Sequence, residues 1–593
     1  MLLTILGAIL LASPLVLILL FKNKTLGFLL IFSSLTAFHL FISMASQAFH
    51  IFNYEVVLSV TILLALASVM FVIINKQKCS FNFKLSWLTV LAFFIIFFEL
   101  FSVHYLYTGL MTTISGHKNV TNHSYPYPYF SDEWAGVAFT NYSIKTEKLP
   151  ISHPLLGYNK YDFPNIFVGF FAGLAELFLI LNLAPLLGYP IINILTGLLI
   201  CYLVYLFLKT SGVKEFFAVF GALCLPWIVN SVNLPGVWFL LPFTGGTIFL
   251  LITLIAFNLK DKNLALGSGV ISLLLYPPFI VLVAPTLLAG LLAGKKISWS
   301  QILKSLTKIA APIFFIVILV FLLQYNNFSN LFNLFADSLI RINNEGCIPI
   351  RPIWFIIPVW LLPLAGIGIY SAFKKKLYYY LTPLLIGLIF WSVYAFTPYF
   401  LIIDYARMAV ITSYLLMIAI GLGLALVFKW LIAKFKFLKN KDVMLAITII
   451  VMLIFLFLSF FYTQREMWNK IILRYDTVLG KWDRPNDPPA NAYLHADDLR
   501  LFEGLSQQIF LTIPWKGLVI GAATGNYPME SKASIVTNYQ SSYEMFMLIS
   551  CSNKNDTANI IKLDYLYSTP IDCPKFKYIG HSAEGLYLYK FQP

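Results

Sequence analysis

Long apolar runs separated by short polar gaps occupy most of the chain. A run of about 20 apolar residues can cross a bilayer as an α-helix. The runs here reach that length repeatedly, and lysines gather in the gaps between them. This pattern predicts an all-α polytopic membrane bundle with about fourteen spans. The expected spans lie near residues 2–21, 26–46, 56–74, 86–108, 190–208, 215–231, 238–258, 264–276, 278–293, 309–323, 353–372, 378–396, 408–428 and 443–462.

One gap, residues 109–189, is far longer than the others and contains a further apolar segment at 164–184. If that segment crossed the membrane, the lysine clusters at Lys295/Lys296 and Lys374–Lys376 would fall outside the cytoplasm. If it instead lies in the outer interface, or dips and returns, every lysine cluster falls on the cytoplasmic side, as the positive-inside rule requires. Glu176 in its middle also favours a segment that does not face lipid. We therefore predict that it does not cross, and that both chain ends and the long loop are extracytoplasmic.

The C-terminal tail, residues 464–593, mixes polar and apolar positions. Residues 494–511 carry apolar side chains at helical spacing, which predicts an amphipathic helix. Short apolar runs predict strands at 518–522, 534–537, 563–567 and 585–591. The glycine-rich stretch 521–525 fits no nucleotide-binding motif and is expected to be a turn. The tail is thus predicted to be a small α/β extracytoplasmic domain.

Together these features divide the chain into three parts. Residues 1–85 supply three additional N-terminal transmembrane helices, and residues 86–463 form a transmembrane core with the large outer loop at 109–189. Residues 464–593 form the α/β domain. Cys551 and Cys573 both lie in this domain, and outside the cytoplasm they are the candidate disulfide.

Composition supports the membrane assignment and changes how the net charge is understood. The chain is 59% hydrophobic and only 11% charged, against about 25% charged residues in soluble domains. Its net charge of +15 would suggest a nucleic-acid partner in a soluble protein. Here lysines in the inner loops account for the charge, and the sequence contains no RNA- or DNA-binding motif. We expect membrane lipid as a partner, and no nucleic acid.

Adjacent carboxylates stand out in the long outer loop, in the stretch Ser131-Asp132-Glu133-Trp134. One interpretation is structural, because Ser131 or Asp132 could cap a helix that runs from Glu133 to Tyr142. The other is chemical, because Asp132 or Glu133 could act as a general base or bind a divalent cation such as Mg²⁺ or Mn²⁺. The sequence alone leaves both open. His153 and Tyr158 follow in the same loop and are candidates for binding an acceptor or supporting the carboxylates.

The arginines form a second candidate group. All of them fall on the predicted outer side, whereas the inner loops use lysine. Arg407 follows Asp404 and Tyr405 at the outer start of a late span, and Arg341 lies in the preceding outer loop. An arginine at a span end can snorkel without further role, but its planar guanidinium also suits a phosphate. We expect Arg407 and Arg341 to bind a lipid phosphate, with Asp404 and Tyr405 near the acceptor.

In order and topology these features resemble the GT-C superfamily of integral-membrane glycosyltransferases, which includes protein O-mannosyltransferases and lipid A aminoarabinose transferases. The resemblance covers roughly residues 86–465. Its matching features are Asp132-Glu133, His153-Pro154-Leu155, the segment 164–184, Lys209 and Arg407. The chain departs from the pattern in lacking a second acidic motif near residues 230–236. It also lacks the Trp-Trp-Asp-Tyr-Gly motif of oligosaccharyltransferase catalytic subunits.

The resemblance implies transfer of a sugar from a polyprenyl-phosphate donor to a glycan, lipid or protein acceptor outside the plasma membrane. It implies that Asp132, or alternatively Glu133, is the base or metal ligand and that Arg407 contacts the donor phosphate. A single displacement would invert the anomeric centre. Two alternatives come from other classes. A multi-pass transporter or lipid flippase would favour ionisable residues inside spans, of which Glu99 and Glu176 stand out without a basic partner nearby in sequence. A non-catalytic scaffold is the other.

Overall fold

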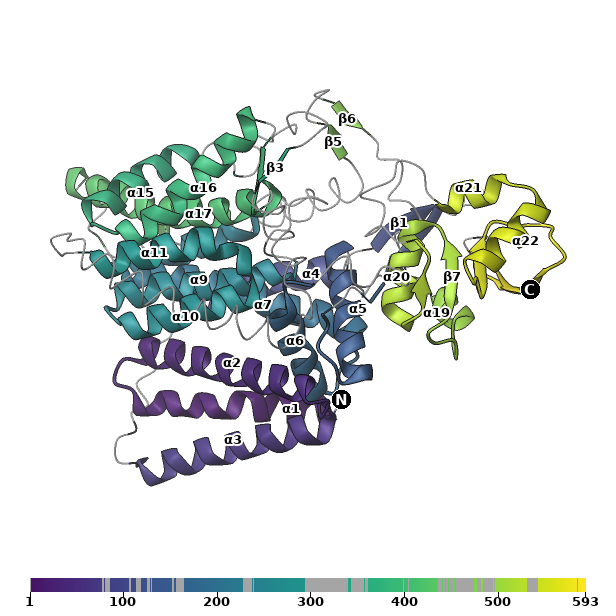
Figure 1. Ribbon diagram of the computed structural model, residues 1–593. Coiled ribbons are helices and arrows are strands. Elements are labelled where there is room, and N and C mark those ends of the chain that lie inside the picture. Colours follow the sequence, from purple (N-terminus) through teal and green to yellow (C-terminus); the bar gives the residue numbers. More distant parts are fainter. Residues whose placement is uncertain are drawn as a thin grey trace.

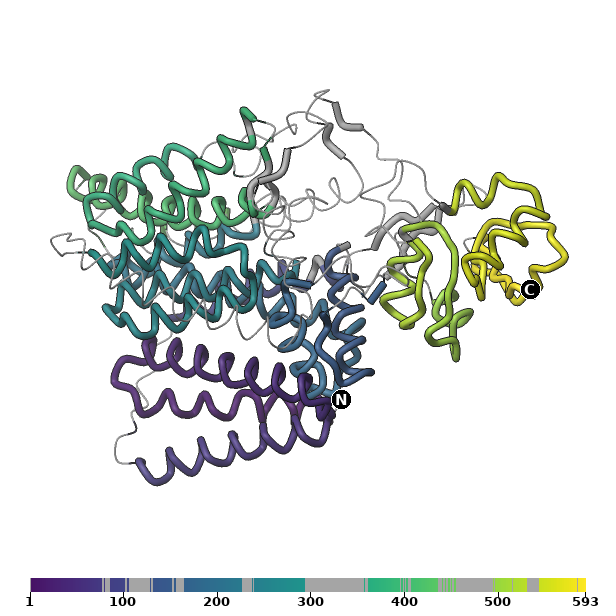
Figure 2. Tube along the Cα trace, viewed as in Figure 1, coloured from purple at the N-terminus to yellow at the C-terminus, as the bar shows by residue number. Residues whose placement is uncertain are grey.

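The protein is described here from a computed structural model, which is mostly helical (Figure 1). The described residues are 2–76, 86–105, 131–151, 165–227, 239–293, 361–397, 405–435, 496–530, 542–583 and 585–593, with short strands and a few single positions between them. The expected all-α membrane bundle with a small C-terminal α/β domain is confirmed (Figure 2).

The helices of the membrane part follow one another with short connections. Their bounds are α1 Leu2–Ala12, η1 Ser13–Leu20, α2 Lys24–Ala48, α3 Tyr54–Ile74, α4 Trp87–Tyr105, α5 Ser131–Thr146, α6 Val168–Leu181, α7 Pro185–Thr210, α8 Glu215–Leu223, η3 Leu225–Trp227, α9 Pro242–Asn258, α10 Lys262–Leu275, η4 Pro277–Phe279, α11 Ile280–Leu292, α15 Leu362–Lys374, α16 Tyr378–Phe396 and α17 Tyr405–Lys434. Among them α15 packs along α17, α10 along α9, and α11 along α16.

Within the described residues, five helical stretches are long and apolar enough to cross a membrane. They are Leu2–Leu20, Lys24–Ala48, Tyr54–Ile74, Pro185–Thr210 and Arg407–Lys434, and shorter apolar helices accompany them. The chain is therefore an integral membrane protein. The span expected at 309–323 lies outside the described residues, as do parts of those at 353–372 and 443–462.

Prolines shape three of the predicted spans. The first span changes from α-helix to 3₁₀-helix at Ser13, next to Pro14, because proline has no N–H for the helical ladder. The span expected at 215–231 is wrong in length, since α8 ends at Leu223 and a 3₁₀ turn containing Pro226 follows. The break expected at Pro277-Pro278 is present and separates α10 from α11.

Helix α6 falls in the segment whose crossing was in question. At 14 residues it is about 21 Å long, shorter than the ~30 Å hydrocarbon core. It packs against α1, α2 and α3 on one side and α5 on the other. Glu176 is 1% exposed, as the sequence predicted for a residue that does not face lipid.

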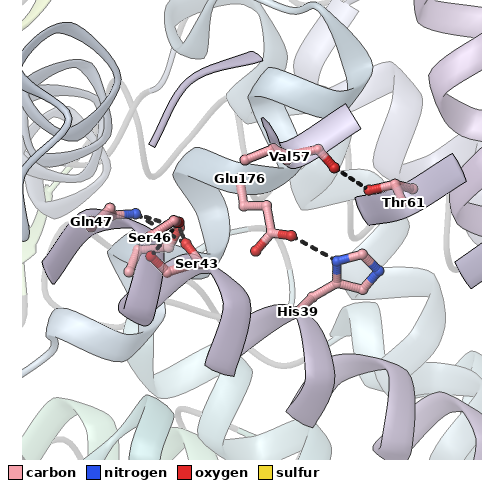
Figure 3. A network of polar contacts seen from close by, with 8 residues as sticks. His39, Ser43, Ser46, Gln47, Val57, Thr61 and Glu176 are labelled. Atoms are coloured by element: carbon pink, nitrogen blue, oxygen red, sulfur yellow. Dashed lines mark hydrogen bonds and ion pairs between the residues drawn. The ribbon is translucent and has the colours of Figure 1, made fainter. Parts of the chain in front are cut away.

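A polar seam joins α2 to α6 (Figure 3). His39 Nδ1 lies 2.7 Å from Glu176 Oε1, and Ser43 Oγ donates to the Ala172 carbonyl at 2.6 Å. Gln47 Nε2 donates to Ser43 Oγ at 3.0 Å. His39, Ser43 and Gln47 are spaced four residues apart, so they share one face of α2. Inside a bilayer the hydrophobic effect does not drive helices together, because lipid is as apolar as their side chains. Hydrogen bonds of this kind therefore help membrane helices to associate.

The C-terminal domain is a five-stranded sheet with helices on it. Its strand order is β10-β11-β9-β7-β8; β7 is parallel to β8 and β9, and the other pairs are antiparallel. The bounds are α19 Ala496–Leu501, β7 Ile509–Thr512, α20 Pro514–Thr524, β8 Tyr527–Pro528, α21 Ser542–Leu548, α22 Cys551–Ile560, β9 Tyr565–Ser568, β10 Phe576–His581 and β11 Tyr587–Phe591. A fully buried ion pair joins Lys516 Nζ to Asp498 Oδ2 at 2.5 Å, and a disulfide links Cys551 to Cys573.

Three predictions for this domain are wrong. The helix expected at 494–511 ends at Leu501, and residues 509–512 form β7; Gly504, at φ +77°, turns the chain between them. The strand expected at 518–522 is the middle of α20, and the turn expected at 521–525 is that helix's last turn. Proline at the helix start and Gly525 in the left-handed conformation at its end are the start and stop signals that define α20. The strand expected at 534–537 lies outside the described residues.

The N-terminus and the C-terminal domain lie at the same end of the helical bundle in Figure 1. Helix α5 is at this end too, beside α6 and α20. Helix α5, the chain start and the α/β domain therefore share one side of the membrane part.

Candidate functional site

Helix α5 carries the paired carboxylates in its first turn, so the helix expected from the capping pattern is present. Three elements hold it. Phe139 stacks on Phe171 of α6 with ring centroids 4.5 Å apart, and α7 and α20 pack on other faces. Gly136 fits directly beneath the Tyr189 side chain of α7, because a Cβ there would lie 1.9 Å from the tyrosine hydroxyl oxygen. A residue without a side chain is needed for this approach.

Asp132 and Arg407, 275 positions apart in sequence, are in direct contact. Arg407 Nη2 donates to Asp132 Oδ2 at 2.8 Å. The Arg407 side chain is 30% exposed and that of Asp132 is 44% exposed, so substrates can reach both. Each residue lies in the first turn of its helix, α17 or α5. The ends of the two helices therefore converge, and their N-terminal partial positive charges favour an anion.

Glu133 has a different environment from its neighbour. It is 1% exposed, and its Oε1 accepts from Asn193 Nδ2 at 3.0 Å and from the Leu240 backbone N–H at 2.9 Å. These contacts tie α5 to α7 and to the start of α9. Without the Glu133 carboxylate, the Asn193 amide and the Leu240 N–H would be buried without an acceptor, which would destabilise the fold. Glu133 therefore has a structural role.

Of the remaining predicted site residues, the structure describes two, Arg341 and Tyr405. Strand β3 (Ile340–Ile342) pairs with β4 (Tyr399–Leu401), which brings the Arg341 backbone opposite Phe400, just before α17. Tyr405 begins α17. His153, Tyr158 and Asp404 lie outside the described residues.

Both carboxylates are engaged by groups of the protein. Asp132 is engaged by a guanidinium, and a buried Glu133 oxygen by two N–H donors. Within the part of the chain that the structure describes, no group of three or more His, Cys, Asp or Glu side chains could hold a metal ion. A divalent cation at Asp132 or Glu133 stays a prediction of the sequence.

Sequence reasoning missed the residues that support the site. Asn193 lies within the span expected at 190–208, and no role was expected for it there. A polar side chain inside an apolar run often indicates a polar partner within the protein. The partner of Glu176 was also missed, because His39 is 137 positions away. Tyr189 and Gly136 carry no local signal, since their contact exists only when α5 and α7 come together.

Comparison with known proteins finds similarity only among solved structures. No protein-family model and no curated protein sequence matches it. Among solved structures, it is similar to the oligosaccharyltransferase of Archaeoglobus fulgidus in its apo form, with 12% identity, a TM-score of 0.48 and coverage of 86% of this chain and 75% of that one. That enzyme, AglB, is also known with an inhibitory peptide and a dolichol-phosphate, with 13% identity, a TM-score of 0.46 and the same coverage.

A mycobacterial protein is also similar. The arabinofuranosyltransferase AftD has 12% identity and a TM-score of 0.48, over 86% of this chain and 42% of that one. By their names, AglB is an oligosaccharyltransferase and AftD is an arabinofuranosyltransferase.

Proposed function

We propose that this chain is a membrane glycosyltransferase that moves a sugar from a polyprenyl-phosphate donor to an acceptor hydroxyl on the extracytoplasmic face of the plasma membrane. The observation that carries the proposal is the contact between Asp132 and Arg407 at the converging ends of α5 and α17. A carboxylate can accept the proton of the attacking hydroxyl. A guanidinium can hold a phosphate bidentately and stabilise the charge that develops on it.

The reaction is a single displacement. The acceptor oxygen forms a bond to the anomeric carbon while its proton passes to the Asp132 carboxylate. The bond between the anomeric carbon and the phosphate oxygen breaks, and both its electrons leave with the polyprenyl phosphate, which Arg407 holds. Attack from the face opposite the phosphate inverts the anomeric centre.

The ion pair is then the resting state of the site. The donor phosphate replaces the Asp132 carboxylate as the partner of Arg407, and the carboxylate becomes available to the acceptor. Both side chains are partly exposed, and a pair of that kind holds together by only about 0–1 kcal/mol. A phosphate can therefore open it at little cost.

Glu133 supports this site without taking part in the chemistry. Its contacts with Asn193 and Leu240 fix the first turn of α5. Asp132 is the base in this proposal, and Glu133 positions it.

The test is transfer of label from a radiolabelled polyprenyl-phosphate sugar pool to membrane fractions. We expect Asp132→Ala to reduce transfer by about 10²–10⁴-fold, the usual contribution of a general base. Arg500→Ala is the control, because Arg500 is 68% exposed and pairs with Asp497, three residues earlier in the C-terminal domain. Equal labelling by wild type and Asp132→Ala, at equal protein levels, would refute the proposal.

A transporter or flippase is the second candidate, and the seam between α2 and α6 favours it. The His39–Glu176 pair is an ionisable contact within the membrane part, of the kind that marks substrate or proton paths. Glu176→Gln separates the two functions. It keeps a hydrogen bond to His39, so we expect it to leave sugar transfer intact, whereas a proton-coupled transporter would lose its coupling.

A further inference from the structure

The C-terminal domain contacts the membrane part at the same helix that carries Asp132. Asn141 Nδ2 donates to the Ala522 carbonyl at 2.9 Å, and Lys145 Nζ donates to the Thr524 carbonyl at 3.4 Å. Asn141 and Lys145 are four residues apart on α5, so they present one face to α20. Both hydrogen bonds thus run from the base-bearing helix to the α/β domain.

The acceptors of these bonds are carbonyls at the C-terminal end of a helix. Ala522 and Thr524 belong to the last turn of α20, whose carbonyls have no N–H partner within the helix. That end of α20 also carries partial negative charge, which favours the Lys145 cation. Gly525 ends the helix at φ +79°, and a Cβ there would lie 3.1 Å from Lys145 Nζ. The C-terminal end of α20 therefore offers Asn141 and Lys145 two carbonyl acceptors, a partial negative charge and the space left by Gly525.

Close packing accompanies the hydrogen bonds. A Cβ at Gly521 would come within 2.9 Å of Leu155, which is 2% exposed and lies in the outer loop beyond α5. Helix α20 thus contacts α5 and the loop that follows it. On the membrane side, α5 is held by Phe171 and Tyr189. Helix α5 is therefore packed between the helical bundle and the C-terminal domain.

We infer that Asn141 and Lys145 are positioning residues, through which the C-terminal domain fixes the helix that presents Asp132 to the acceptor; this rests on the proposed function. Asp132 lies nine residues before Asn141, about 14 Å along one continuous helix. A displacement of about 1 Å at a reacting group can cost roughly 10²-fold in rate. Loosening the far end of α5 would therefore lower the rate of transfer without removing any group that touches substrate.

Asn141 also begins an Asn-Tyr-Ser triplet, a pattern that accepts N-linked glycans when it is exposed. Its side-chain nitrogen donates to the Ala522 carbonyl, so the docked asparagine serves the contact with α20.

The test uses the full chain in nanodiscs. Lys145→Ala removes one donor and Asn141→Asp replaces the other with an acceptor, while Lys145→Arg retains a cation and a donor. Lys148→Ala is the matched control, since Lys148 is exposed just beyond the end of α5. Hydrogen–deuterium exchange of the peptide covering residues 131–137 reports the first turn of α5, and transfer kinetics report kcat and the donor KM separately.

We expect Lys145→Ala and Asn141→Asp to speed exchange at 131–137 and to lower kcat by about 10-fold or more. The donor KM should stay within about twofold, because Arg407 is untouched. Lys145→Arg should restore both readouts, and Lys148→Ala should match wild type. Unchanged exchange at 131–137, or faster exchange with an unchanged kcat, would overturn the inference. Absence of transfer by the wild type would instead overturn the proposed function, and exchange would still decide whether the domain steadies α5.

Discussion

Asp132 and Glu133 are adjacent in sequence and differ in every physical respect that matters for function. Asp132 is 44% exposed and faces a guanidinium. Glu133 is buried and bonded to groups on α7 and before α9. A helix places consecutive side chains about 100° apart, so one can face the site while the next enters the core. On this difference we base the proposal that Asp132 transfers the proton and Glu133 supports it.

The resting ion pair makes a prediction about phosphate binding. Asp132→Asn removes the carboxylate that competes with phosphate for Arg407. We expect this variant to bind polyprenyl monophosphate about 2–5-fold more tightly, the effect of losing an exposed pair, while transfer is lost. Microscale thermophoresis in nanodiscs can measure the affinity, and Arg407→Ala should weaken it. An affinity that falls in Asp132→Asn would mean that the carboxylate helps to hold the phosphate.

The buried carboxylate makes a prediction about stability. Glu133→Ala leaves the Asn193 amide and the Leu240 N–H without their acceptor. We expect the free energy of unfolding to fall by about 2–4 kcal/mol. Asp132→Ala should change it by less than about 1 kcal/mol. Thermal unfolding of both variants in the same nanodiscs gives the comparison, and equal losses would show that Glu133 is not the structural member.

At the scale of elements, α5 is positioned by contacts that come from three distant parts of the chain. The bundle supplies Phe171 and Tyr189, the C-terminal domain supplies α20, and α17 supplies the arginine. None of these elements alone contains the site. In the proposed function, the first turn of α5 can act as a reaction centre because all three converge on it.

The close approach of α5 to α7 can be tested by adding one methyl group. Gly136→Ala would place its Cβ 1.9 Å from the Tyr189 hydroxyl oxygen, so α5 must move away from α7. We expect lower thermal stability and lower transfer. Tyr189→Phe removes that oxygen and should recover part of the loss in the double variant, as a double-mutant cycle measures. A Gly136→Ala variant as stable and active as wild type would show that α5 tolerates the shift.

The sequence predicted elements better than it predicted their partners. Hydrophobic run length identified the long spans, and the acidic pair identified the start of α5, because both signals are local. The run at 518–522 was assigned to a strand because a short apolar run cannot be distinguished from a buried helix by periodicity alone. The pairings of Asp132 with Arg407 and of His39 with Glu176 depend on long-range packing. The sequence marks Asp132 and Arg407 as separate candidates but does not predict their contact. It gives no sign that His39 pairs with Glu176.

At the scale of the whole molecule, topology determines which substrates can meet. The chain start, α5 and the α/β domain lie at one end of the bundle (Figure 1), which fits a site served by a lipid donor and an acceptor from the same side. The lysine distribution predicts that this side is outside the cytoplasm.

Substituted cysteines can establish the sidedness. Lys148 and Lys262 are both exposed, beyond α5 and at the start of α10. With Cys79 and Cys347 replaced by serine, we expect a membrane-impermeant maleimide to label Lys148→Cys in intact cells. Lys262→Cys should be labelled only after permeabilisation. The reverse pattern would place the site on the cytoplasmic side and exclude the proposed arrangement.

The most direct test of the central claim asks whether Asp132 acts as a base. Azide is an anionic nucleophile that has no proton to lose, so its attack on the anomeric carbon needs no base. We expect Asp132→Ala to transfer label from the polyprenyl-phosphate sugar pool to azide at a rate close to that of wild type, while transfer to hydroxyl acceptors stays about 10²-fold lower or more. A glycosyl azide formed by wild type but not by Asp132→Ala would contradict the claim, and would mean that Asp132 serves binding or structure instead.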